Sequence, residues 1–162
     1  MASFAKDVQV EELFKELGKS DSKKDKLFDS MKDVYMLAFL LGMRKNERKK
    51  ISKKSSDPIK EEIFGEENKI IMDFMALEKT KDINILKKTE EADEYIHNMV
   101  EEYANGGIHI LYDLLGKSHD LDKLISIVKT YEDDNEDIEK ARANLEADVF
   151  LNLYSQMSKD DK

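Results

Sequence analysis

Hydrophobic residues recur along most of the chain at spacings of three and four, the period of an amphipathic α-helix. The densest run covers residues 31–43, where apolar side chains occur on every side of the predicted helix. A helix that is apolar all round is buried rather than laid on a surface. We therefore predict that this helix lies at the centre of the fold.

The two ends of this central helix carry their own signals. Ser30 followed three residues later by Asp33 is typical of a capping box, which satisfies free N–H groups of the first turn. The pattern thus predicts a helix start at Met31. Gly42 is expected to weaken or end the helix, because glycine is unfavourable in a helix interior.

The same periodicity predicts further helices separated by polar or glycine-containing stretches. Asp57 followed by Pro58 is typical of a helix start, and Asn105-Gly106-Gly107 is expected to separate two helices. Residues 19–26 are predicted to be a polar connector and residues 83–86 a helical turn. The predicted helices cover residues 7–17, 57–64, 67–78, 90–104, 108–115, 121–131 and 138–157.

The predicted fold class is therefore all-α, a single-domain compact bundle of about six to eight helices. Its parts are an N-terminal helix and connector (1–29), the buried helix with a basic segment (30–64) and a helical remainder (65–162). A length of 162 residues suits one domain, and 39% charged residues with one proline suit long, salt-bridged helices.

Composition also limits the chemistry. The chain has no cysteine, which excludes disulfides, a thiolate nucleophile and cysteine-based metal sites. No apolar run approaches the ~20 residues of a membrane span, and the start lacks the apolar run of a secretory signal. We expect a cytoplasmic protein.

Positive charge is concentrated in one place. The net charge is −9, yet residues 44–54 carry seven basic residues and one acid. Such a segment could neutralise DNA phosphates and release counterions. The candidate nucleic-acid-binding residues are Arg44, Lys45, Arg48, Lys49, Lys50, Lys53 and Lys54.

Two other interpretations of this basic segment stay open. Its charges could pair with the acidic remainder of the chain, or with an acidic partner protein. Residues 44–54 contain no aromatic side chain to stack on bases, so contact with a duplex backbone is expected rather than reading of single strands.

No set of catalytic or metal-binding residues stands out. Asp93 and His97 lie one helical turn apart, but two ligands do not make a metal site. We expect no metal, no cofactor and no enzymatic activity. Adjacent carboxylates are expected to be solvated surface, because acid–base catalysis needs two environments that separate their pKa values. These pairs are Glu61-Glu62, Glu66-Glu67 and Glu101-Glu102.

Two stretches resemble a known family. Phe28-Asp29-Ser30-Met31-Lys32-Asp33-Val34-Tyr35-Met36-Leu37-Ala38, ending at Leu41-Gly42 and followed by the basic run and Asp57-Pro58-Ile59, is similar to the front of small proteins associated with bacterial Dnd systems. Glu101-Glu102-Tyr103-Ala104-Asn105-Gly106-Gly107-Ile108-His109-Ile110-Leu111 resembles their rear motif. Together the stretches span about half of the chain in the family's order.

Dnd systems place sulfur in the DNA backbone as phosphorothioate and use the mark for host defence. The resemblance therefore implies an accessory protein in DNA modification or restriction, with other proteins of that system as partners. The function hypothesis is a non-enzymatic, DNA-associated accessory or adaptor protein of an antiviral defence system. The alternative is a protein–protein interaction module with no direct DNA contact. The sequence leaves the oligomeric state open.

Overall fold

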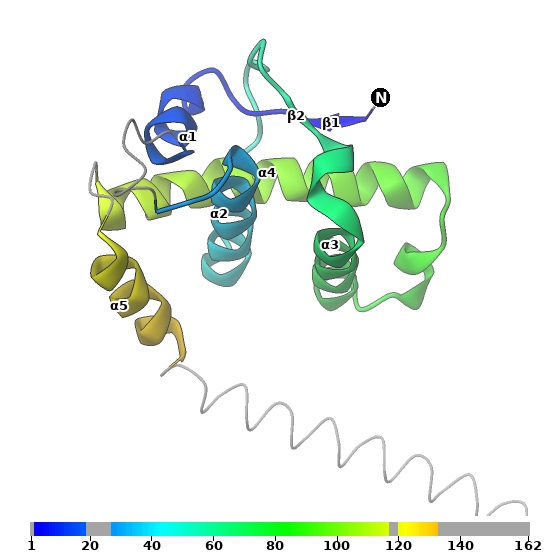
Figure 1. The fold of residues 1–162 in the computed structure, drawn as a ribbon. Coiled ribbons are helices and arrows are strands. Elements are labelled where there is room, and N and C mark those ends of the chain that lie inside the picture. The colour runs from blue at the N-terminus through cyan, green and yellow to red at the C-terminus, as the bar shows by residue number, and fades with distance from the viewer. Residues whose placement is uncertain (1, 19–26, 117–119, 133–162) are drawn as a thin grey trace, which may run out of the picture. The chain divides into compact units, whose positions relative to one another are not determined.

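The computed structural model describes residues 2–18, 27–116 and 120–132, and the chain divides into two compact units, Met1–Asp120 and Leu121–Lys162. The elements of the first unit are shown in Figure 1. In chain order they are β1 (Ser3–Phe4), α1 (Glu11–Gly18), α2 (Met31–Lys45), β2 (Ile59–Lys60), the 3-10 helix η1 (Glu61–Phe64), α3 (Gly65–Thr80), the 3-10 helix η2 (Ile83–Leu86) and α4 (Glu90–Leu115). The described part of the second unit is α5 (Leu121–Glu132).

The fold is mostly helical, as the sequence predicts, apart from the small sheet. The described residues form five α-helices, and the prediction of six to eight is wrong. The difference arises because one long helix replaces two predicted ones, and because a strand at 59–60 and a 3-10 helix at 61–64 stand where the sequence predicts a helix over 57–64. The polar connector at 19–26 and the helix predicted at 138–157 lie outside the described residues. The prediction of a single domain stays a prediction.

α2 is the buried central helix that the sequence predicts, and it packs across α4 (Figure 1). Its start is confirmed at Met31, since the Ser30 N–H and hydroxyl both donate to the Asp33 carboxylate at 2.9 and 2.8 Å. Val34 and Phe39 are fully buried. Burying each such side chain contributes about 1.5–3 kcal/mol, so this helix supplies much of the core.

Three glycines make the crossing of α2 and α4 possible. A Cβ atom on Gly42 would overlap the main-chain oxygen of Tyr103, and one on Gly107 would overlap that of Ala38. Gly106 is equally close to the main-chain oxygen of Glu47. Gly42 and the Gly106-Gly107 pair are therefore contact residues inside helices. Close backbone packing offsets the roughly 1 kcal/mol that each glycine costs a helix.

Two predictions about helix ends are corrected by this packing. α2 continues past Gly42 to Lys45, and Asn46 ends it in the left-handed conformation with φ 53°. α4 runs without a break through Gly106 and Gly107 to Leu115. The predicted end at Gly116 is confirmed, because this residue is the C-cap of α4.

A short two-stranded sheet holds the N-terminus, and one of its strands lies where the sequence predicts a helix at 57–64. β1 pairs antiparallel with β2, with Phe4 opposite Ile59, so the helix predicted to begin at Pro58 does not form. The Phe4 ring packs against Tyr35 and Phe64 at centroid distances of 5.9 and 5.2 Å. This aromatic contact, made by three distant segments, favours the extended backbone that brings Phe4 to the core.

α1 begins at Glu11, later than the predicted residue 7, because Asp7 and Val8 make hydrogen bonds to residues 52 and 53. α3, η2 and α5 confirm the helices predicted at 67–78 and 121–131 and the turn at 83–86. Within the described ranges, no helix is long and apolar enough to cross a membrane.

Candidate nucleic-acid interface

The basic segment, residues 44–54, leaves the end of α2 and passes over the surface of α4. The Lys49 N–H donates to the main-chain oxygen of Glu102 at 3.0 Å. The Asn105 side-chain amide donates to the main-chain oxygens of Lys49 and Lys50 at 3.2 and 3.3 Å. The middle of the segment is therefore fixed by main-chain groups, which leaves its side chains available for other contacts.

Asp7 anchors the second half of the basic segment. Its carboxylate accepts hydrogen bonds from the main-chain N–H and the hydroxyl of Ser52, the latter at 2.8 Å, and from the Lys53 N–H at 3.4 Å. The Val8 N–H donates to the Lys53 oxygen at 2.9 Å. Burial raises the pKa of Asp7, but these donors together with the Gln9 N–H hold the pKa below its ordinary value. Asp7 therefore stays ionised near neutral pH.

All seven predicted residues lie on the surface. Arg44 and Lys45 belong to the last turn of α2, and the other five follow in the irregular segment. Exposed side chains are found at Arg44, Lys45, Arg48, Lys49, Lys50, Lys53 and Lys54.

Two of the seven cations pair with carboxylates of α4. Arg48 Nε contacts Glu102 Oε2, and Lys54 Nζ lies 3.6 Å from Glu101 Oε2. Lys49, Lys50 and Lys53 make no ion pair with any described residue. Part of the positive charge is thus neutralised within the chain. The remaining positive charge of the irregular segment is carried by these three lysines.

A further cation, which the sequence analysis did not select, joins this surface from α3. Lys79 Nζ lies 5.3 Å from the centre of the Tyr103 ring, and Arg48 Cζ lies 5.6 Å from the same ring. The Tyr103 hydroxyl and Lys79 both donate to Asn46 Oδ1, at 3.1 and 2.7 Å. Cation–π contacts of this kind hold the cations close to the protein surface.

Two open hollows lie beside the basic segment, and Lys50 lines both. The larger, of about 710 Å³, is lined by Arg48, Lys50, Ile51, Lys54, Tyr95, Asn98, Glu101 and Glu102. The smaller, of about 330 Å³, is lined by Asp7, Gln9, Val10, Lys49, Lys50, Ser52, Asn105 and His109.

Sequence reasoning missed Tyr95 and Asn98, which bring an aromatic ring and an amide to the larger hollow. Their signal is the spacing of Tyr95, Asn98 and Glu102 on α4, which places the three residues on one helix face. In the smaller hollow, burial and the nearby Lys49 lower the pKa of His109. His109 is therefore neutral at pH 7 and adds no cation to the surface.

Glu101 corrects the expectation that the carboxylate pairs are all solvated surface. It is only 4% exposed, and its Oε1 accepts the Ala5 N–H at 2.6 Å and lies 3.0 Å from His97 Nε2. Burial raises the pKa of Glu101, but the contacts with His97 and Ala5 outweigh that effect and lower it. Glu101 is thus an ionised group inside the protein that holds the N-terminal segment.

His97 stacks on the Phe4 ring at 4.7 Å and contacts Glu101, the residue one turn after it. Asp93 and His97 both line a third hollow, of about 450 Å³. Over residues 2–18, 27–116 and 120–132, no group of three or more His, Cys, Asp or Glu side chains is placed to hold a metal ion. The contacts of His97 assign it to packing at the N-terminus.

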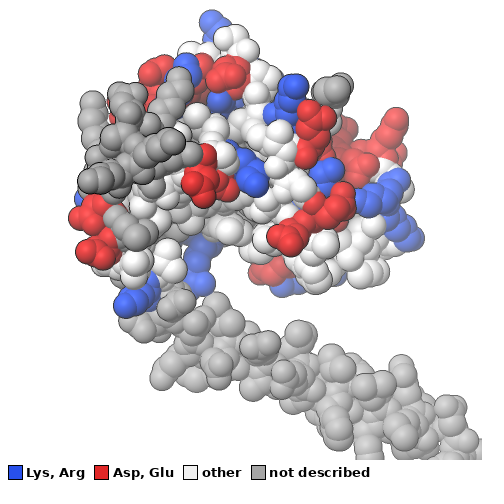
Figure 2. All heavy atoms as spheres, viewed as in Figure 1, with Lys and Arg blue, Asp and Glu red and all other residues white. Residues whose placement is uncertain are grey.

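The face shown in Figure 2 carries acidic and basic side chains mixed together. A mixed surface gives little net attraction for a polyanion, since the fields of opposite charges cancel within a Debye length of about 8 Å at physiological salt. Among its described residues, this face therefore offers no concentrated positive charge, in contrast to the composition of the basic segment.

The fold and surface define a small, mostly helical protein whose basic segment is fixed by main-chain hydrogen bonds across a long helix. The chain belongs to the family of DNA sulphur modification system-associated protein 4, whose family model matches residues 4–148. This confirms the resemblance to Dnd-associated proteins and extends it beyond residue 120, where the two motif stretches gave no signal. Neither the curated proteins nor the solved structures gave a match to the chain.

Proposed function

We propose that this member of a DNA sulphur modification system is a non-enzymatic, cytoplasmic accessory protein that contacts duplex DNA phosphates and serves host defence. The basic segment would make these contacts, and the rest of the surface would bind other proteins of the system. Family membership supports the accessory role. The proposed contact residues are Arg44, Lys45, Arg48, Lys49, Lys50, Lys53 and Lys54.

The observation that carries the proposal is the fixed path of the basic segment. Hydrogen bonds from Lys49 to Glu102, from Asn105 to Lys49 and Lys50, and from Ser52 to Asp7 set the main chain in place before any ligand binds. A pre-ordered segment loses less conformational entropy on binding than a mobile one. The cations would therefore project toward phosphates from fixed main-chain positions.

The same path favours contact with the DNA backbone over reading of bases. A major groove is about 12 Å wide and admits a helix or a two-stranded ribbon. The basic segment is neither of these after Lys45, and its main chain is bonded along α4. Phosphate contacts position a protein without carrying sequence information. We therefore propose binding that does not depend on base sequence.

The ion pairs of the basic segment favour a second candidate, a protein–protein module with no DNA contact. Arg48 and Lys54 already bind carboxylates of Glu102 and Glu101, so the segment has the chemistry to bind an acidic partner. In that case an acidic peptide would bind to the lysines of the basic segment, and a DNA duplex would not bind.

The test compares two triple variants that change net charge equally. Lys49, Lys50 and Lys53 are replaced by Glu in one, and the exposed Lys60, Lys81 and Lys87 in the other. Binding of a labelled duplex of ~20 base pairs is measured by fluorescence anisotropy at about 50 and 200 mM salt, with a poly-glutamate peptide as competitor. Arg48 is left unchanged, because it packs on Tyr103.

The DNA proposal expects loss of duplex binding in the first variant, retention in the second, and unchanged helical circular dichroism in both. Equal loss in the two variants would assign binding to net charge alone and remove these lysines from the proposal. Tight binding of the acidic peptide without duplex binding would establish the second candidate instead.

A further inference from the structure

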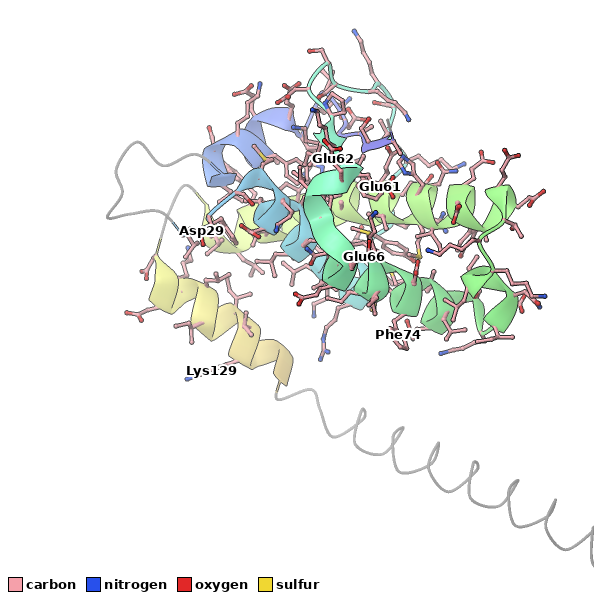
Figure 3. All side chains as sticks on the ribbon, turned by 45° about the vertical axis from the view of Figure 1, so that its right-hand side comes forward. Asp29, Glu61, Glu62, Glu66, Phe74 and Lys129 are labelled. Atoms are coloured by element: carbon pink, nitrogen blue, oxygen red, sulfur yellow. The ribbon has the colours of Figure 1, made fainter. Side chains whose placement is uncertain are left out.

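α3 exposes an apolar stripe on the side opposite to its buried residues. Met72 and Ala76 face the core at 2% and 0% exposure, whereas Ile70, Ile71 and Phe74 are 51%, 38% and 63% exposed. In Figure 3 the Phe74 side chain projects away from α3. Residues three and four apart are neighbours on a helix surface, so these three side chains form one continuous stripe.

Single exposed apolar residues are ordinary, but a contiguous exposed patch is typical of an interaction site. The next element along the chain also exposes apolar side chains, with Ile83 at 66% and Leu86 at 38%. The apolar surface is therefore more than one isolated residue, and it lies apart from the basic segment in sequence.

Acidic residues accompany this stripe along α3. Helical spacing places Glu67 and Glu78 within the exposed half of α3, and Glu66 and Asp73 along one flank. Glu78 Oε1 lies 3.6 Å from Lys81 Nζ, so its charge is partly neutralised within the chain. Of the two lysines of α3, Lys79 donates to Asn46 Oδ1, and Lys69 lines the hollow beside Phe4 together with Asp73. The exposed half of α3 thus combines apolar side chains with negative charge.

We propose that the exposed face of α3 is a docking site for an amphipathic helix of a partner protein, with an apolar stripe and Lys or Arg along its flanks. Two helices would pack their apolar stripes together, and the basic flanks would lie next to the acids of α3. Charge complementarity with the acids of α3 favours a basic helix over a neutral or acidic one.

The same argument disfavours occupants from the protein itself. Residues 133–162 carry many more acids than bases, so that segment would meet like charge on α3. A second copy in a symmetric pair would place two acidic faces opposite each other, because a twofold interface joins the same patch of both subunits. Like charges across an interface oppose association.

The test uses the absence of cysteine from the chain. Leu77→Cys, which removes no acid, provides one attachment point, one helical turn after Phe74, for a dye that reports loss of water. The probe is a helix-forming peptide of ~18 residues, about 27 Å long, with a leucine stripe and lysine flanks. A second peptide has glutamate in place of every lysine.

We expect the dye to be hydrated in the free protein at every protein concentration and to lose water when the lysine peptide binds. The lysine peptide should bind at least about tenfold more tightly than the glutamate peptide. Phe74→Ser should weaken binding about tenfold or more, given the apolar area lost. Val8→Ser, which alters an apolar side chain of 44% exposure outside α3, should leave the affinity unchanged.

Each opposite result overturns the proposal. Equal affinity for the two peptides, or equal loss in Phe74→Ser and Val8→Ser, would show that the face does not select a basic helix. A dye shielded without peptide at every protein concentration would identify the chain's own residues as the occupant. Shielding that rises with protein concentration would identify a second copy.

Discussion

Gly107 of α4 lies so close to the main-chain oxygen of Ala38 in α2 that a Cβ atom at position 107 would overlap it. Gly42 of α2 is equally close to the main-chain oxygen of Tyr103 in α4. The two sequence stretches that resemble the family therefore meet at one crossing of two helices. Close packing at this crossing accounts for the glycines of both stretches.

Gly107→Ala is expected to destabilise the protein by about 3 kcal/mol or more, because the added methyl group meets main chain that cannot move aside. Gly18→Ala is the matched control, because its Cβ would first meet the flexible end of the Met31 side chain, at 3.2 Å, and not a main-chain oxygen. The control should change stability by less than about 1 kcal/mol. Urea unfolding of both variants measures the difference, and equal losses would contradict the tight crossing.

Glu101→Gln is expected to lower the free energy of unfolding by about 2 kcal/mol near pH 7, since a buried charged acceptor for Ala5 is lost. The folded pKa of Glu101 lies below its ordinary value of 4.5. Its contribution is therefore complete above that pH and disappears as pH falls through the folded pKa.

Urea unfolding between about pH 7 and pH 3 checks this prediction. The wild type and Glu101→Gln should differ most at neutral pH and converge in acid. A difference that stays constant down to the lowest pH would show that ionisation of Glu101 contributes nothing to stability.

Asp7→Ala is expected to release the second half of the basic segment. The amides of Ser52 and Lys53 lose their acceptor, so their hydrogen exchange should accelerate, and stability should fall by about 1–3 kcal/mol. Asp82→Ala is the control, because Asp82 also accepts a main-chain N–H, that of Asn84, but as the N-cap of η2, far from the basic segment in sequence. Unchanged exchange at Ser52 and Lys53 in Asp7→Ala would remove Asp7 as an anchor.

If the basic segment binds duplex phosphates, replacing Lys49, Lys50 and Lys53 by Gln should make the affinity fall less steeply with salt. Each lost contact makes the slope of log affinity against log salt less negative by about 0.9, so the loss of three contacts changes it by about 2.7. The same change at Lys60, Lys81 and Lys87 should leave the slope as in the wild type. A slope that does not change in the first variant would show that these lysines release no counterions.

Local signals in the sequence predicted much of the helical fold. The Ser30 and Asp33 pair set the start of α2, and Gly116 set the end of α4, because capping depends on residues close in sequence. Gly42, Gly106 and Gly107 were interpreted by propensity alone as helix-ending. Their role in close packing depends on a helix far away in sequence, and the helix propensity of a single residue carries no information about that helix.

The candidate site likewise combines features that local sequence predicts with features that depend on distant residues. The exposure of the basic segment follows from its composition, but its anchors Asp7 and Asn105 are 45 and 56 residues from their bonding partners Ser52 and Lys49. Glu101 did carry a local signal: it shares a helix face with Ala104 and Ile108, both buried. An acid on an apolar face indicates a buried, hydrogen-bonded charge.

Main-chain groups of Lys49 and Lys50 hold the middle of the basic segment on α4, and Arg48 and Lys54 add ion pairs with that helix. The side chains of Lys49, Lys50 and Lys53, which make no ion pair with a described residue, can therefore vary in sign while the route of the segment over the helix is retained. Evolution or design could tune the attraction of this protein for a charged partner through such changes, with little effect on the packed helices beneath.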